Sequence, residues 1–276
     1  MIPLGSLSVR ESRVLELLAR FRFLTRSQLQ AFLFPQMRDS ASSDVMTRRV
    51  LHSLLSRGLV SRTERIVGGS TGGSAAQAWF IAPQAQRVIG DLRLAGGPRR
   101  LAPRGTFLLR HCLATAEVAL AFEASVRDHE GHRLLCFECE WEVAVRLEGG
   151  TLVPDAYLIY ETDEVELHAF VEVDLGSSGS RHFASKISRY LLLWREGSWR
   201  RRFDLWPTVL VVAPDEARVK LLARTTEAVL RTQPEAVAEA TEFAFASLAA
   251  VRQDPLGPIW QVAGRAGRHP LLKGAR

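Results

Sequence analysis

The chain has 276 residues, of which 47% are hydrophobic and 24% are charged, which is the composition of a globular protein large enough for two domains. It contains no apolar run long enough to span a bilayer and no signal-peptide core, which argues against membrane insertion and export. Three cysteines without a disulfide pattern suit a reducing compartment. Together these features predict a cytoplasmic protein without a membrane partner.

The charge is unevenly distributed along the chain. The formal net charge is +6 at pH 7, yet residues 1–110 hold 17 Arg, no Lys and 6 acidic residues, a local balance of +11. Residues 111–276 hold 19 basic and 24 acidic residues, a balance of −5. A basic excess favours a polyanionic partner, so we expect the N-terminal part to bind double-stranded DNA.

The first domain, residues 1–94, has the pattern of a winged helix-turn-helix. Ser8 and Thr25 each precede an amphipathic segment, which predicts two capped helices. A third helix is expected over about residues 44–57, capped by Ser42 or Ser43. Two strands joined by a Gly-rich turn complete the domain as a β-hairpin, the wing, at 59–67 and 78–82.

In a winged helix-turn-helix the third helix enters the DNA major groove, where arginine can contact phosphates or guanine. One face of this helix is expected to be buried, through Val45, Val50, Leu51, Leu54 and Leu55. The predicted DNA-binding residues of the opposite face and the wing are Thr47, Arg48, Arg49, His52, Arg62 and Arg65. The alternative is a winged helix that serves dimerisation or protein docking.

A helix at 83–94 and a Gly- and Pro-rich linker at 95–105 lead to a second domain, 106–262, which a basic tail follows at 263–276. The predicted elements of this domain run helix, strand, hairpin, helix, strand and helix, with further short strands at the end. That order predicts an α/β (α+β) domain in which helices flank a mixed sheet.

An antiparallel hairpin is the central prediction, because residues 152–161 and 165–174 alternate apolar and polar side chains around a short polar break. Any loop of even length places Asp155 directly opposite Glu172. One face of the hairpin is then apolar, and the other carries Asp155, Glu172 and Asp174. Opposed carboxylates are unfavourable unless a cation lies between them, so these three acids are the candidate ligands of Mg²⁺ or Mn²⁺. The alternative is a solvated sheet face with scattered acids.

The helix after the hairpin carries Lys186 and Tyr190 four residues apart, on one face. A lysine there could stabilise negative charge on a phosphate under attack by a metal-bound water. Lys186 is therefore a candidate catalytic residue beside Asp155, Glu172 and Asp174. An ordinary solvated lysine is the alternative.

Pro154-Asp155 and Glu172-Val173-Asp174 resemble the motif of the restriction-endonuclease-like, or PD-(D/E)xK, nuclease superfamily. Asp174 stands where that motif has lysine, which leaves Lys186 as the substitute from the next helix. If no lysine reaches the acids, metal binding can survive while hydrolysis is weak or lost.

The winged helix, the segment Arg110-His111-Cys112-Leu113-Ala114 and the motifs above together resemble the replication-relaxation family of bacterial plasmids and other mobile elements, over about residues 8–262. The resemblance implies that His111, Lys186 and Tyr190 lie near the site acids. Glu117, on the helix of His111, is a further candidate accessory carboxylate. A cap or core role is the alternative for His111.

We therefore expect a DNA-binding protein of a mobile element that acts in replication or relaxation as an Mg²⁺- or Mn²⁺-dependent endonuclease or nickase. The alternatives are a non-enzymatic winged-helix regulator with a degenerate nuclease fold and a protein-docking adaptor. Replication or conjugation proteins and a second copy of the chain are the further candidate partners.

Overall fold

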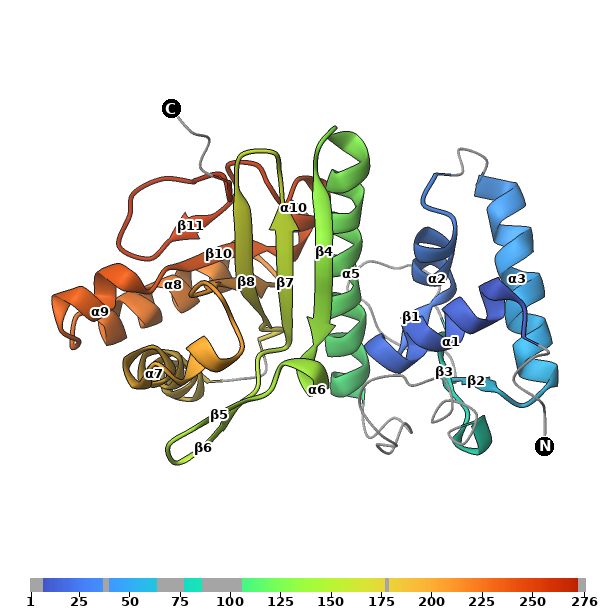
Figure 1. The fold of residues 1–276 in the computed structure, drawn as a ribbon, viewed down its shortest axis with the longest axis horizontal. Helices are drawn as coiled ribbons and strands as arrows, with labels where there is room; N and C mark the ends of the chain where they lie inside the picture. Colours follow the sequence, from blue (N-terminus) through green and yellow to red (C-terminus); the bar gives the residue numbers. More distant parts are fainter. Residues whose placement is uncertain (1–6, 37–39, 64–76, 86–105, 177–178, 273–276) are drawn as a thin grey trace. The chain divides into compact units, whose positions relative to one another are not determined.

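A computed structural model shows a mixed α/β protein (Figure 1). It describes residues 7–36, 40–63, 77–85, 106–176 and 179–272. The chain divides into two compact units, residues 1–120 and 121–276. The division falls inside helix α5 (Thr106–Asp128), which the sequence assigned as a whole to the second domain. The predicted linker at 95–105 lies outside the described residues.

The first half of α5 belongs to the first unit because its apolar side chains complete the core of that unit. Leu109 and Cys112 are buried together with Phe23 and Ala78. Of the helix predicted at 83–94, the described part is a single 3-10 turn, η2 (Pro83–Ala85).

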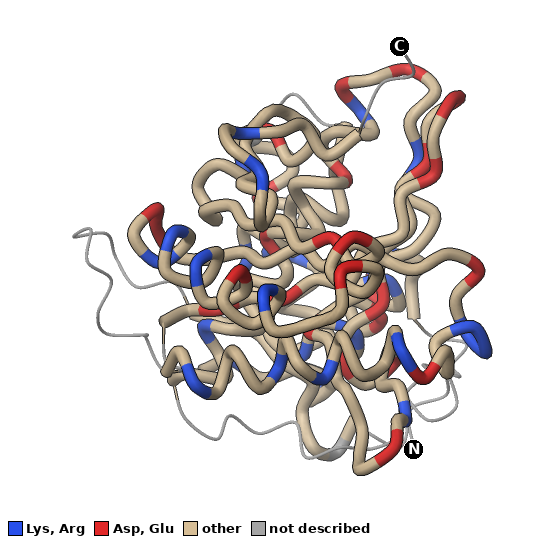
Figure 2. The backbone as a smooth tube through the Cα atoms, turned by 90° about the vertical axis from the view of Figure 1, so that its left-hand side faces the viewer, with Lys and Arg blue, Asp and Glu red and all other residues tan. Residues whose placement is uncertain are grey.

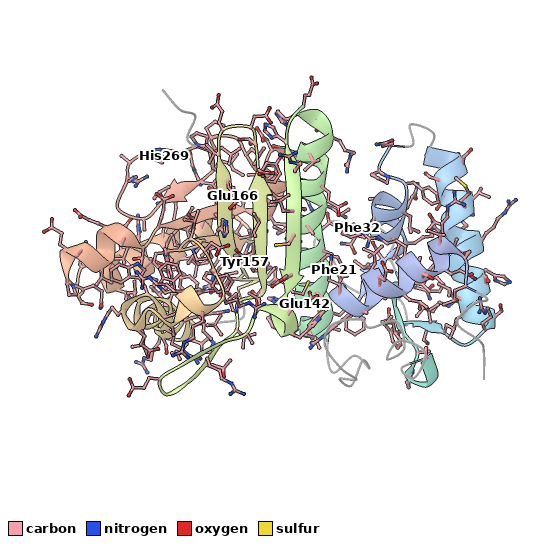
Figure 3. All side chains as sticks on the ribbon, viewed as in Figure 1. Phe21, Phe32, Glu142, Tyr157, Glu166 and His269 are labelled. Atoms are coloured by element: carbon pink, nitrogen blue, oxygen red, sulfur yellow. The ribbon has the colours of Figure 1, made fainter. Side chains whose placement is uncertain are left out.

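The first unit begins with two helices, α1 (Val9–Phe21) and α2 (Arg26–Leu33), that start where the sequence predicts. Ser8 and Thr25 each accept a hydrogen bond from a backbone N–H three residues on, and the side chain at that third position bonds back to the cap. The two helices pack through the stacked rings of Phe21 and Phe32, whose centroids lie 5.2 Å apart (Figure 3).

Replacing Thr25 by alanine should lower the free energy of unfolding by about 1 kcal/mol. The Thr25 hydroxyl accepts from the Gln28 N–H at 3.2 Å, and alanine leaves that donor unsatisfied at the start of α2. Urea unfolding of Thr25→Ala against wild type measures the loss. Thr25→Ser retains the hydroxyl and should remain within a few tenths of a kcal/mol of wild type; an equal loss in both variants would contradict the capping role.

The third helix, α3 (Ser40–Ser56), starts earlier than predicted, so the expected cap at Ser42 or Ser43 was wrong. Ser43 lies inside the helix, where its hydroxyl accepts from the Gln30 side chain at 2.6 Å. The helix ends at Gly58, whose positive φ of 66° suits glycine. The unit also holds a three-stranded antiparallel sheet in the order β1-β3-β2, formed by β1 (Leu24–Thr25), β2 (Val60–Arg62) and β3 (Ala78–Ile81).

The second unit is built on a six-stranded mixed sheet in the order β11-β10-β9-β8-β7-β4. The pairs β8–β9 and β9–β10 are parallel and the other pairs are antiparallel. The strands are β4 (Arg133–Cys139), β7 (Ala156–Glu161), β8 (Glu166–Val173), β9 (Thr208–Ala213), β10 (Phe243–Ser247) and β11 (Gln261–Val262).

Helices cover both faces of this sheet (Figure 1). Phe122 of α5 packs on Tyr160 of β7, with ring centroids 5.8 Å apart. The other face lies under α7 (Ser180–Glu196) and α8 (Glu216–Leu230) and forms the main core, in which Phe170 contacts Tyr190. The smaller elements are α6 (Glu140–Val143), β5 (Val145–Leu147), β6 (Gly150–Leu152), η3 (Ser198–Arg201), α9 (Glu235–Ala240) and α10 (Leu248–Gln253).

The C-terminal part departs from the prediction in two places. The strand expected over 243–251 ends at Ser247, whose side chain caps α10. The predicted basic tail folds back in its described part, because Trp260 and His269 exchange two backbone hydrogen bonds of 3.1 and 2.8 Å. Within the described parts of the chain, no helix is both long and apolar enough to cross a membrane.

Candidate active site and nucleic-acid interface

Strands β7 and β8 pair in the predicted register. Ala156 lies opposite Val171 and Leu158 opposite Ala169, and the loop closes as the Thr162 N–H donates to the Val165 carbonyl at 2.8 Å. Just before β7, the Asp155 N–H donates to the Val171 carbonyl at 3.0 Å, and Asp155 Oδ2 accepts from the Val173 N–H at 2.7 Å, which holds this carboxylate beside the end of β8. The two carboxylates therefore meet at one end of the hairpin.

Glu172 is buried, with 4% of its surface exposed, and α7 supplies a partner for each of its carboxylate oxygens. The Lys186 ammonium donates to Oε2, and the Tyr190 hydroxyl donates to Oε1 at 2.5 Å. The Lys186 Nζ also lies 4.0 Å from Asp155 Oδ1. The four residues Asp155, Glu172, Lys186 and Tyr190 are called the acid–lysine cluster below.

The electrostatics of the cluster follow from its burial under α7. Burial raises the pKa of Glu172 to about 7; the Lys186 ammonium opposes this rise and the Asp155 carboxylate adds to it. Burial tends to lower the pKa of Lys186, but the Glu172 and Asp155 carboxylates outweigh it and raise that pKa. Burial and the Glu172 charge raise the pKa of Tyr190 well above its ordinary value. Lys186 is thus a cation at neutral pH, and Glu172 titrates near neutrality.

In metal-free buffer, the free energy of unfolding should fall as the pH rises from about 4.5 to 7. Over this interval the folded protein keeps a proton on Glu172 that the unfolded chain has released, so raising the pH favours the unfolded chain. The full loss is on the order of 3 kcal/mol. Urea unfolding at several pH values measures it. The glutamine of Glu172→Gln cannot ionise, so this variant should lack this part of the pH dependence. If the free energy of unfolding changes with pH equally in both proteins, the raised pKa of Glu172 is contradicted.

Asp174, the predicted third site acid, forms its ion pair with Arg218 of α8, and its charge also contributes to the raised pKa of Lys186. Its two carboxylate oxygens accept from Arg218 Nε and Nη2 of α8, each at 2.9 Å. Oδ1 also accepts from the Gly176 N–H at 2.8 Å. The planar guanidinium fork matches a carboxylate, so Asp174 ties the end of β8 to α8.

The structure brings together two carboxylates, those of Asp155 and Glu172, and not three. Among the residues that the structure describes, no group of three His, Cys, Asp or Glu side chains could hold a metal ion. Asp155 and Glu172 offer hard carboxylate oxygens at one place, and Mg²⁺ is commonly held by one or two carboxylates together with waters and substrate phosphates.

The two accessory candidates of α5 take part in the packing of the first unit. The His111 ring stacks on Phe107 with centroids 6.2 Å apart. Glu117 Oε1 accepts from Gln28 Nε2 at 2.6 Å, and the same amide nitrogen donates to the Leu113 carbonyl at 3.0 Å. Glu117 therefore joins α5 to the first turn of α2.

On α3, three of the four predicted DNA-binding residues are exposed, namely Arg48, Arg49 and His52. Thr47 is fully buried and donates to the Ser43 carbonyl at 2.8 Å, so the prediction that it lies on the exposed face was wrong. Val45, expected in the core, is 44% exposed. The buried stripe of the helix runs instead through Ser43, Thr47, Leu51 and Leu54.

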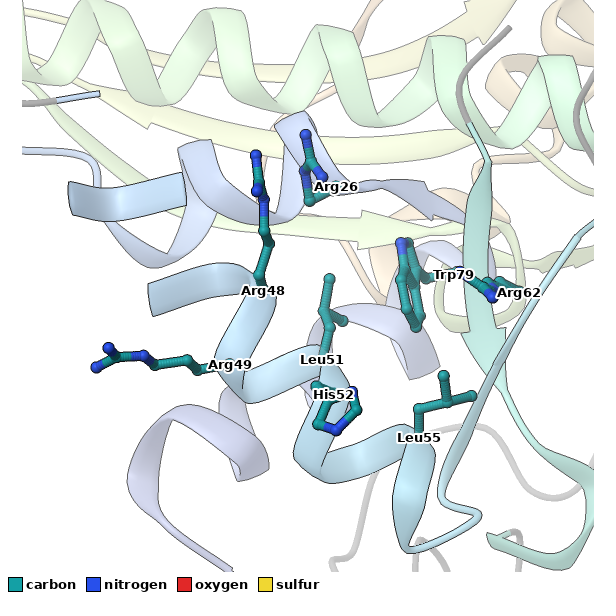
Figure 4. A pocket seen from close by; sticks show the side chains of 8 residues that line it. All are labelled: Arg26, Arg48, Arg49, Leu51, His52, Leu55, Arg62 and Trp79. Carbon is teal, nitrogen blue, oxygen red and sulfur yellow. The ribbon is translucent and has the colours of Figure 1, made fainter. Parts of the chain in front are cut away.

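The exposed face of α3 and the neighbouring strands line a hollow of about 580 Å³ (Figure 4). Asp44 binds Arg26 at 3.0 Å and also pairs with Arg48, and Figure 4 shows these two guanidinium groups side by side while Arg49 points away. Arg65 lies outside the described residues. The lining residues are Arg26, Arg48, Arg49, Leu51, His52, Leu55, Arg62 and Trp79.

Arg26 and Trp79 line this hollow and were not predicted to do so, and Asp44, the ion-pair partner of Arg26 and Arg48, was not predicted either. The spacing of Asp44 and Arg48, four residues apart on one helix, was a signal for their ion pair. Arg26 and Trp79 come from α2 and β3, and only the tertiary structure brings them to α3. The hollow thus combines arginine side chains, which can contact phosphates, with apolar and aromatic side chains, and such a surface is suited to nucleic acid.

These features define a mixed α/β protein of two units, one with a basic hollow beside a helix and one with a carboxylate–lysine cluster on a mixed sheet. The chain belongs to the replication-relaxation family, whose sequence model matches residues 15–209. Membership supports a role in the replication or relaxation of mobile elements. No curated protein and no solved structure gave a significant match.

Proposed function

We propose that this protein binds DNA of a plasmid or other mobile element and cleaves or nicks a phosphodiester bond during replication or relaxation. The observation that carries the proposal is the meeting of Asp155, Glu172 and Lys186 in one cluster. Two carboxylates can hold a divalent cation, and a lysine can stabilise the charge that develops on a phosphate during hydrolysis. They resemble the PD-(D/E)xK arrangement, with the lysine supplied by α7 instead of β8.

In the proposed reaction, Asp155 and Glu172 would hold Mg²⁺ or Mn²⁺, and the ion would supply Lewis-acid polarisation of the phosphate and activation of a water. Lys186 carries a positive charge beside both acids and stabilises the negative charge that develops on the phosphate. Tyr190 orients the Glu172 carboxylate through its 2.5 Å hydrogen bond. Asp174 has a structural role in this proposal, because its ion pair with Arg218 fixes the end of β8 to α8.

The first unit is proposed to be a winged helix-turn-helix that docks on duplex DNA. The helices α1, α2 and α3 followed by the β2–β3 pair support this assignment, and so does the basic hollow beside α3. In this proposal Arg48, Arg49 and His52 face the major groove, and Arg62 contacts the DNA backbone.

Arg49→Gln should weaken duplex binding and lower the slope of log K against log salt by about 1, since one phosphate contact is lost. Arg49 is exposed on α3 and lines the hollow. Fluorescence anisotropy with a labelled duplex over a salt series measures both quantities. The matched control is Arg13→Gln on the exposed surface of α1, which removes the same charge. Equal effects of the two variants would contradict the assignment of α3 as the DNA-binding helix.

The cleavage proposal is tested by incubating the full chain with supercoiled, linear duplex and single-stranded DNA in the presence of Mg²⁺ or Mn²⁺. Wild type should nick or cut at least one of them, and Asp155→Asn should lose the activity while it still binds DNA. Intact DNA in every wild-type reaction would contradict the proposal.

The second candidate function is a non-enzymatic DNA-binding regulator with a nuclease-like scaffold. It is favoured by one observation, that the oxygens of Glu172 and Asp174 already bind Lys186, Tyr190 and Arg218. In that case Asp155→Asn would leave DNA binding unchanged, and wild type would cut nothing.

A further inference from the structure

The exposed side of α7 is positively charged over almost its whole length. From Ser180 to Arg195 the helix holds Arg181, Lys186, Arg189 and Arg195, and it has no acidic residue before Glu196. Basic and acidic positions are interspersed along the backbone as a whole (Figure 2). Helix α7 shares its basic character with α8, which carries Arg218, Lys220 and Arg224.

The acid–lysine cluster reaches solvent along this same helix. Lys186 has 27% of its side chain exposed and Asp155 has 13%, whereas Glu172 has 5%. On a helix surface His182 lies one turn before Lys186, and Arg189 lies one turn after it. His182 is exposed and Arg189 is partly exposed, so positive or hydrogen-bonding groups flank the opening of the cluster on both sides.

The β5–β6 hairpin runs alongside α7 and extends this surface. At its tip, the Glu148 N–H donates to the Glu196 carboxylate at 3.0 Å. Farther along, Arg189 donates to the Thr151 carbonyl at 2.5 Å, and Thr151 is paired with Arg146 of β5. The chain then continues from β6 to Asp155, beside Lys186.

The exposed Arg146 is thus the strand partner of Thr151, whose carbonyl accepts from Arg189 of α7. The close fit depends on Gly150, since a Cβ there would lie 3.3 Å from Arg189 Nη2. Arg146, Arg181, His182, Lys186 and Arg189 are called the α7 strip below. From residue 182 to residue 189 the helix advances about 10 Å.

We propose that the α7 strip binds the phosphate backbone of a single DNA strand and guides it past the acid–lysine cluster. The inference rests on the proposed function and adds a second DNA-binding surface, separate from α3. The cations of the strip cover the exposed surface of α7 and the neighbouring β5, where they can contact successive phosphates of one strand. The strip also explains how a phosphate reaches Lys186, the most exposed member of the cluster.

The test compares two double variants of the full chain, each of which loses two positive charges. Arg146→Gln/Arg181→Gln removes the two exposed arginines of the strip, and neither residue belongs to the acid–lysine cluster. Lys220→Gln/Arg224→Gln is the matched control, because both residues are exposed on α8 of the same unit. A fluorescein-labelled single-stranded oligonucleotide is titrated in EDTA over a salt series, so that binding is measured without cleavage.

The strip variant should bind the oligonucleotide several-fold more weakly, with a salt slope lower by about 1.4, since each phosphate contact on a single strand contributes about 0.7. The control variant should keep the wild-type slope. Equal slopes for the strip variant and wild type would overturn the inference, whatever the cleavage result. A second outcome separates the two proposals. If the strip variant binds the oligonucleotide more weakly than wild type, but wild type cuts no DNA with Mg²⁺ or Mn²⁺, the proposed cleavage is refuted and the strip is upheld as a DNA-binding surface.

Discussion

Lys186→Met is expected to slow DNA cleavage by about 100-fold or more, the usual effect of removing one group that stabilises transition-state charge. Methionine retains an unbranched side chain but removes the ammonium that lies beside Glu172 and Asp155. The fold should survive, because the pKa of Glu172 is already about 7 and the carboxyl can take up a proton when its cationic partner is lost. Single-turnover cleavage measures the rate, and thermal unfolding reports on the fold.

A comparison with Ser185→Ala separates the chemistry of Lys186 from general damage to α7. Ser185 is the exposed neighbour of Lys186 on the same helix, so its variant should cut DNA at the wild-type rate. Lys186→Met should still bind Mn²⁺, because the lysine is not a ligand and its ammonium competes for Glu172. A folded Lys186→Met protein that cuts as fast as wild type would remove Lys186 from the mechanism.

Asp174→Ala should lower the free energy of unfolding by about 3 to 5 kcal/mol, because it removes the carboxylate that pairs with the largely buried Arg218 guanidinium. The side chains of Arg218 and Asp174 are only 13% and 9% exposed, and two hydrogen bonds of 2.9 Å join them. Urea unfolding of the metal-free protein measures the loss. The exposed pair Arg133 and Glu161 gives the control, and Glu161→Ala should cost less than about 1 kcal/mol.

This prediction also distinguishes two roles for Asp174. A residue that joins β8 to α8 affects stability in the absence of metal, as expected here. A metal ligand instead carries a negative charge that is unfavourable in the empty site, so its removal would be neutral or stabilising without metal. A stable Asp174→Ala protein with weakened Mn²⁺ binding would restore Asp174 to the ligand set.

Local sequence rules predicted the parts of the fold that depend on neighbours in the chain. The capping side chains Ser8 and Thr25 fixed the starts of α1 and α2. The period of two in the hairpin, with an even loop, determined the register that brings Asp155 to Glu172. The spacing of four residues then placed Lys186 and Tyr190 on the helix face that reaches Glu172.

The errors arose at residues whose burial or partner depends on the tertiary structure. Thr47 was assigned to the exposed face of α3 because it is polar, but its hydroxyl is satisfied by the Ser43 carbonyl of its own helix and can be buried. Asp174 was assigned to the metal because it alternates with Glu172, yet Arg218 comes from α8, 44 residues further along the chain. Hydrophobic periodicity carries no information on which distant cation meets a given carboxylate.

Calorimetric titration of Mn²⁺ into wild type, Asp155→Ala/Glu172→Ala and Asp174→Asn tests most directly whether Asp155 and Glu172 form the centre of an active site. It requires no knowledge of the DNA substrate. We predict that wild type and Asp174→Asn bind Mn²⁺ alike and that the double variant does not bind. Absence of binding to all three proteins, or equal binding to all three, would contradict a metal-dependent site at the acid–lysine cluster.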